Sequence, residues 1–104
     1  AATWLSRGLA VAVMTPAMLP DGWTQGYSVT HVASGLSVGS AIASGERAQR
    51  FAEWLLTLGI DFTQPKVVTR ELTLPVLEKL VEWLASQPFL VSVEEIQAKF
   101  QEVR

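Results

Sequence analysis

Apolar residues follow two different spacings along the chain, alternating with small polar residues before Ser44 and recurring every three or four positions after it. Three runs before Ser44 are rich in β-branched and small residues, namely residues 9–15, 26–32 and 36–43. Such runs predict strands, because a strand points successive side chains to opposite faces of a sheet. Turn-forming residues separate them, Leu-Pro-Asp-Gly at 19–22 and Ser-Gly at 34–35. We therefore expect a three-stranded antiparallel β-meander over about residues 5–43.

The second turn suggests a register for its hairpin. A two-residue loop at Ser34-Gly35 pairs His31 with Val38 and Tyr27 with Ile42. One face then carries Tyr27, Val29, His31, Leu36, Val38 and Ile42, and the other carries Ser28, Thr30, Val32, Ser37, Gly39 and Ala41. A four-residue loop keeps the same two faces, whereas a three-residue loop mixes them. We expect the first face to lie against the core.

The helical spacing after Ser44 predicts three helices. The first begins at Ser44 or Gly45 and buries Ala48, Phe51, Ala52, Leu55 and Leu58. The second begins around Thr73 and ends before Pro88, which cannot continue it. The third begins at Ser92, which forms a capping box with Glu95.

Together these elements predict an α+β fold in a single two-layer domain of residues 1–104, with the helical part over about residues 45–104. A chain of 104 residues fits one domain, and its 49% apolar content can supply one core. We expect the first helix to pack on the apolar face of the meander.

Charge and composition narrow the classes of function. The net charge of −2 and a pI near 5.3 disfavour nonspecific nucleic-acid binding, which needs clustered Lys and Arg. The absence of cysteine excludes disulfides and thiolate metal sites. The apolar run at 7–19 is too short to span a bilayer, and Pro16 interrupts it. We expect no membrane contact and a cytoplasmic location.

Candidate chemistry is sparse. With one histidine and no cysteine, the sequence offers no converging metal ligands, and we assign no catalytic, cofactor-binding or metal-binding residue. The glycines at 35–45 do not match a phosphate-binding loop, because no lysine follows them. We interpret His31 as a hydrogen-bonded structural residue on the core-facing side of the sheet. The protein is predicted not to be an enzyme.

A surface for binding other proteins is the remaining candidate. The second face of the hairpin carries no charge, and Trp54 and Trp83 lie at the margins of their apolar stripes. Tryptophan at such positions is enriched in interfaces. We predict a small non-enzymatic interaction domain that self-associates or binds another protein. Its interface residues are expected to be Thr30, Val32, Gly39, Trp54 and Trp83.

An alternative is regulatory DNA binding. Residues 77–100 resemble the opening two helices of a helix-turn-helix or winged-helix domain, with Ser92 capping the second of them. Only four residues follow Phe100, so this reading implies a fragment that lacks its recognition helix.

A further resemblance covers about residues 27–58. The segment VTHVASGLSVG, followed by ERAQRFAEWLLTL, resembles short uncharacterised bacterial, phage or plasmid proteins with a Val-Thr-His, Ser/Thr-Gly hairpin before a helix. The resemblance implies a hairpin-then-helix unit and a bacterial or mobile-element origin. It assigns no activity to any residue.

Overall fold

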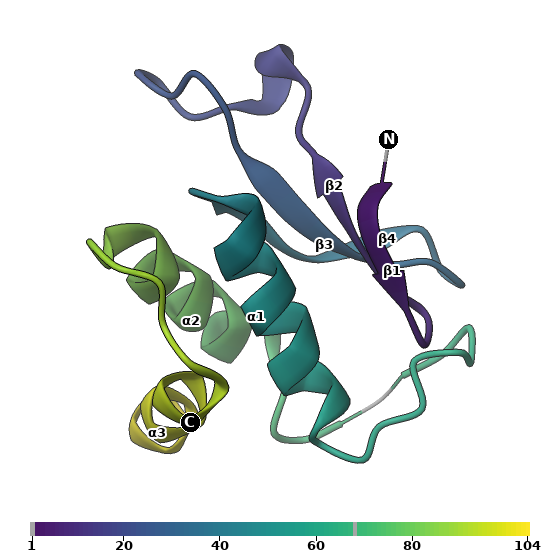
Figure 1. Cartoon of the computed structure of the whole chain (residues 1–104). Coiled ribbons are helices and arrows are strands. Elements are labelled where there is room, and N and C mark those ends of the chain that lie inside the picture. Colours follow the sequence, from purple (N-terminus) through teal and green to yellow (C-terminus); the bar gives the residue numbers. More distant parts are fainter. Residues whose placement is uncertain (1, 68) are drawn as a thin grey trace.

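The computed structural model describes residues 2–67 and 69–104. It has the expected α+β architecture, with an antiparallel sheet and a helical part (Figure 1). The strands are β1 (Ala2–Ser6), β2 (Leu9–Val13), β3 (Tyr27–His31) and β4 (Leu36–Ile42), in spatial order β1-β2-β3-β4. A short 3-10 turn, Pro16–Met18, lies between β2 and β3. The helices of the described residues are α1 (Gly45–Leu56), α2 (Leu74–Ser86) and α3 (Val93–Val103).

The predicted number of strands was wrong, because β1 adds a fourth strand at the edge of the sheet. Arg7 and Gly8 form the two-residue turn into β2, with φ of 47° and 90°. Positive φ at both positions matches the twist of an antiparallel pair. Gly8 is required for a second reason: a Cβ there would collide with the main-chain carbonyl of Phe62. This close approach depends on a distant segment, so the local pattern did not reveal it.

The β3–β4 hairpin confirms one predicted pair and corrects another. Tyr27 lies opposite Ile42, as expected, but His31 pairs with Leu36 instead of Val38. The loop is therefore four residues, 32–35, and β4 carries two register shifts. Such bulges insert extra residues on one strand and change the face toward which the following side chains point.

Helices cover one face of the sheet (Figure 1). α1 packs across β2 and β3, α2 packs along β4, and α3 contacts α1 and α2. Their buried side chains and those of the inner sheet face form one core: Leu9, Val11, Val29, Ile42, Ala48, Phe51, Ala52, Trp54, Leu55, Phe62, Leu77, Leu80, Leu84, Val91, Ile96 and Phe100. Burying each large apolar side chain contributes about 1.5–3 kcal/mol, which offsets the entropy of ordering the chain.

The helix ends confirm the predicted signals. The Ser44 hydroxyl accepts a hydrogen bond from the Arg47 N–H at 3.2 Å, which caps α1. Ser92 and Glu95 form the reciprocal capping box at the start of α3. α2 ends before Pro88. No helix within residues 2–67 and 69–104 has the length and apolar character needed to cross a bilayer.

Candidate functional site

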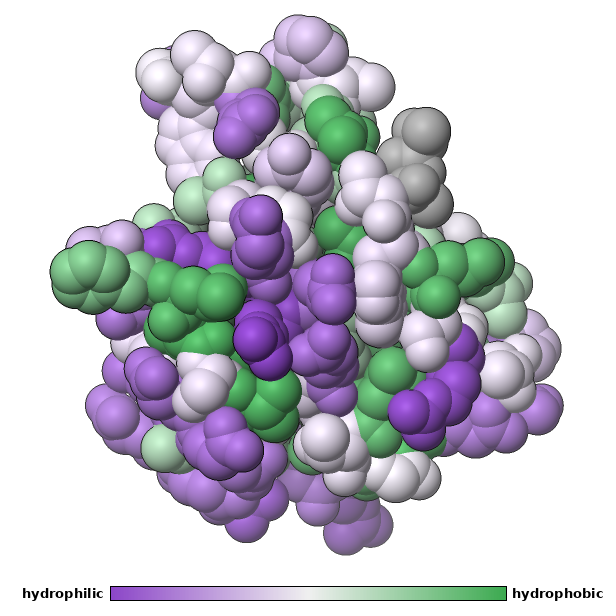
Figure 2. Space-filling view, viewed as in Figure 1, coloured by the Kyte–Doolittle hydropathy of each residue, from purple (hydrophilic) through white to green (hydrophobic). Residues whose placement is uncertain are grey.

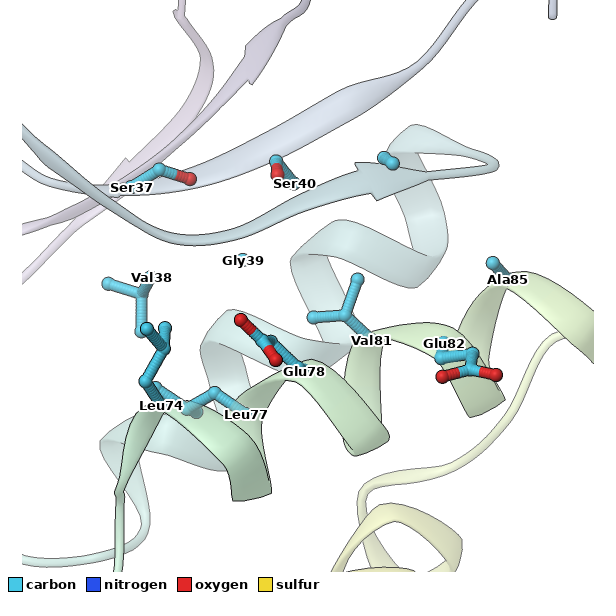
Figure 3. Close-up of a pocket in the computed structure, with 11 residues that line it drawn as sticks. Ser37, Val38, Gly39, Ser40, Leu74, Leu77, Glu78, Val81, Glu82 and Ala85 are labelled. Atoms are coloured by element: carbon cyan, nitrogen blue, oxygen red, sulfur yellow. The ribbon is translucent and has the colours of Figure 1, made fainter. Parts of the chain in front are cut away.

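The outer face of the sheet bears no helix in the described part of the chain (Figure 1). The strand register places one row of side chains across all four strands on this face: Leu5, Ala10, Thr30 and Ser37. Ala12 and Ser28 form a second pair beside it, and Ser40 also points away from α2 (Figure 3). We call this set of seven residues the open face.

The open face is neutral and made mainly of small side chains. Thr30 lies at its centre and is half-buried by its neighbours, as expected for a residue between paired strands. Leu5 is 66% exposed at one end, and Val32, which follows β3 with the same alternation, is 52% exposed. The predicted residue Thr30 thus lies on the open face, and the predicted residue Val32 is exposed in the loop that follows β3.

Gly39 does not belong to this surface, and its predicted placement was wrong. It is buried opposite Val29 and faces the helices. A Cβ at Gly39 would lie 2.8 Å from Val81 Cγ2 and 2.9 Å from Phe51 Cε2. The bulges of β4 cause the change, because they move Gly39 to the opposite face from the one that strict alternation predicts.

The expected exposure of Trp54 was also wrong. Its side chain is fully buried, with ring centroids 5.8 Å from Phe51 and 5.0 Å from Phe100. The indole Nε1–H donates to Gln97 Oε1 at 2.6 Å, so the one polar atom of the ring is satisfied. Trp54 is therefore a core residue that α3 covers.

Trp83 stays partly accessible on α2. It packs against the core and lines a hollow with Lys79, Lys99 and Val103. This hollow lies between α2 and α3, in the helical layer, whereas Thr30 lies on the outer face of the sheet. The two predicted interface elements consequently belong to different surfaces.

An apolar projection marks the connection between α2 and α3. Phe89 is 80% exposed and Leu90 is 50% exposed, and Figure 2 shows apolar residues protruding there. The Arg47 guanidinium holds this connection by donating to the carbonyls of Leu84 at 3.1 Å and Phe89 at 3.0 Å. The projection belongs to the helical layer.

A groove with a volume of about 370 Å³ runs beside the contact between β4 and α2 (Figure 3). Its lining residues are Ser37, Val38, Gly39, Ser40, Ala41, Leu74, Leu77, Glu78, Val81, Glu82 and Ala85. We call it the edge groove, because β4 is the last strand of the sheet. A neighbouring hollow of about 460 Å³ shares Ser37, Val38 and Leu77 with it and continues toward His31 and Lys66. Sequence reasoning missed both hollows, since no local pattern places α2 beside β4.

His31 lies where it was expected, buried on the core-facing side of the sheet with 7% exposure. Its Nε2 is 2.8 Å from the Phe62 carbonyl oxygen, which can only accept, so Nε2 carries the proton in the neutral ring. Nδ1 then accepts from the Ser34 hydroxyl at 2.7 Å. Both ring nitrogens are thus engaged: the Nε2 bond joins the hairpin to the segment after α1, and the Nδ1 bond lies within the hairpin loop.

That segment is shaped by Asp61. Hydrogen bonds from the Thr63 hydroxyl, the Thr63 N–H and the Gln64 amide lower the pKa of the Asp61 carboxyl from its usual value of 3.8. The carboxylate therefore stabilises the turn that follows it and the position of Phe62 beside His31.

The DNA-binding alternative gains no support from the geometry. α2 and α3 are the two helices of that resemblance, and both expose carboxylates, namely Glu78, Glu82, Glu94 and Glu95. Such a surface repels the phosphates of a duplex. No group of three or more histidine or carboxylate side chains that could hold a metal ion occurs among the residues that the structure describes.

No family model, curated protein or solved structure matches the chain.

Proposed function

We propose that this protein is a small non-enzymatic interaction domain that self-associates through the open face of its sheet. The observation that carries this proposal is the neutral row from Leu5 through Ala10 and Thr30 to Ser37, which crosses all four strands. No helix of the described residues lies over this row, and Ala10, with 7% exposure, is its one buried member. A sheet face that carries no charged side chain can be covered by a second sheet without the cost of desolvating a charge.

The side chains of the open face suit a second sheet. Two sheets pack about 10 Å apart when short side chains interdigitate between them. Alanine, serine and threonine allow that approach, and no charged group has to be desolvated. Leu5 and Val32 add exposed apolar area near its margins.

An active site would contradict a non-enzymatic function. His31 is the residue on which such an active site would depend. Its Nε2 and Nδ1 are taken up by Phe62 and Ser34 in bonds that hold the fold together. This arrangement supports a structural role for His31 and a non-enzymatic role for the domain.

The experiment is a comparison of mass in solution by light scattering across a wide concentration series. Thr30→Lys places a charge at the centre of the open face and is expected to give a folded monomer under conditions where the unaltered protein is a dimer or larger. The matched control is Gln101→Lys, which adds the same charge on the exposed side of α3. An unaltered protein that stays monomeric, or a Thr30→Lys protein that still assembles, contradicts the proposal.

A further inference from the structure

The outer side of β4 is a free sheet edge. β4 pairs with β3 on one side only, and no strand of the described residues pairs with its other side. An unpaired edge presents N–H and C=O groups that can bind another extended chain. Addition of a strand from a partner is a common mode of peptide recognition.

In the edge groove, α2 forms a second wall beside the β4 edge, and apolar side chains line the space between them. Leu74, Leu77 and Val81 of α2 face β4 across the groove, and Val38 points toward them (Figure 3). Gly39 permits this arrangement, because a side chain there would push against Val81. A bound segment could place alternate side chains against α2 while its backbone follows β4.

The two walls have similar lengths. Residues 37–41 of β4 extend over at most ~16 Å at about 3.3 Å per residue, because bulges shorten a strand. Residues 74–85 of α2 extend over ~18 Å at about 1.5 Å per residue. The groove therefore matches an extended segment of about five residues.

The charged side chains that line the groove are both negative. Glu78 and Glu82 lie four residues apart on α2 and are the charged residues among those that line the groove, and Glu82 also borders the α2–α3 hollow of Lys79 and Lys99. Like charges at this spacing destabilise a helix. The ion pairs of the described residues join Arg50 to Glu53 and Lys99 to Glu102, so neither groove carboxylate takes part in one there. A cationic side chain of a bound segment would remove this repulsion.

A second copy of the chain fits the edge poorly. Antiparallel pairing of two β4 edges would bring the α2 helices, each with Glu78 and Glu82, toward one another, and their carboxylates would repel. The two bulges of β4 also limit a long ladder between copies. A short segment with a basic residue avoids the charge repulsion, and it needs only a short ladder along β4.

We propose that the edge groove binds an extended segment of about five residues from a partner protein, with a Lys or Arg side chain between Glu78 and Glu82. The edge groove adjoins the open face at Ser37 and Ser40, but its other lining residues lie on α2 and on the helix side of β4, so the proposal goes beyond the proposed self-association. Main-chain bonds to β4 would supply binding strength, and the carboxylates would supply selectivity.

The test uses a library of labelled five-residue peptides in which each position is varied in turn, with binding followed by fluorescence anisotropy. Peptides with Lys or Arg at one position should bind best to the unaltered protein. The double variant Glu78→Gln, Glu82→Gln should bind these peptides about tenfold more weakly, since exposed ion pairs have modest individual strength. The matched control is Glu46→Gln, Glu94→Gln, which removes two exposed helical carboxylates elsewhere and should leave binding unchanged.

A second probe tests the contact with β4. N-methylation of the best peptide's backbone removes donors without altering the protein, and it should abolish binding at one or more alternate positions. A library with no binding peptide, or binding that the Glu78→Gln, Glu82→Gln variant leaves intact, overturns the proposal. Thr30→Lys should still bind the peptide, so failure of the groove and failure of self-association give different results.

Discussion

The Nε2–H of His31 donates to the main-chain carbonyl of Phe62, across 2.8 Å and thirty-one positions of sequence. The same carbonyl lies against Gly8, at the turn between β1 and β2. The Phe62 carbonyl thus contacts one end of the β1–β2 hairpin and one end of the β3–β4 hairpin. It connects both hairpins to the segment after α1. Because the bond is buried, loss of either partner leaves a polar group without water to replace it.

His31→Ala is expected to lower the free energy of unfolding by about 1–3 kcal/mol, because the Phe62 carbonyl loses its buried donor. Urea denaturation of the purified variants measures this quantity. Ser34→Ala is the matched control: its hydroxyl bonds the other ring nitrogen but lies in an exposed loop, so its loss should cost less than about 1 kcal/mol. Equal effects of the two substitutions would show that the His31–Phe62 hydrogen bond does not stabilise the fold more than the His31–Ser34 hydrogen bond.

Gly8→Ala should destabilise the fold by at least about 2 kcal/mol, since the added methyl meets the Phe62 backbone and the residue keeps a positive φ. Gly35→Ala separates the two causes, because Gly35 also has a positive φ, of 73°, but has open space around its Cα. It should cost only about 1 kcal/mol. Thermal unfolding of both variants would reveal the difference, and matching losses would argue against the close approach to Phe62.

Local signals predicted the elements well, and tertiary packing decided the rest. The capping box of Ser92 and Glu95 could be read from the sequence because its partners are three residues apart. Trp54 was misplaced because an amphipathic stripe describes one partner layer, whereas α1 is covered by the sheet and by α3. The position of Gly39 depends on bulges that strict alternation does not contain. The edge groove needs α2 beside β4, which no short-range pattern specifies.

The lowered pKa of Asp61 makes the stability of the fold depend on pH in the acid range. A carboxyl whose folded pKa lies below its unfolded value stabilises the fold above that value, here 3.8, and this contribution is lost as the pH falls through the folded pKa. Asp61→Asn should therefore be less stable than the unaltered protein near neutral pH, with the difference shrinking in acid. Urea midpoints measured across the acid range test this. A difference that stays constant with pH would contradict the role of the Asp61 charge.

Gly39→Ala tests how closely α2 packs on β4. The new Cβ would meet side-chain atoms of Val81 and Phe51 at 2.8 and 2.9 Å, so these side chains or their helices must shift, at a cost of about 1–3 kcal/mol. Val81→Ala removes one of the two obstacles. In that background Gly39→Ala should cost clearly less, because neighbours that share a contact are not additive. The four unfolding free energies form a double-mutant cycle, and an additive cycle would mean that Gly39 and Val81 are not in contact in solution.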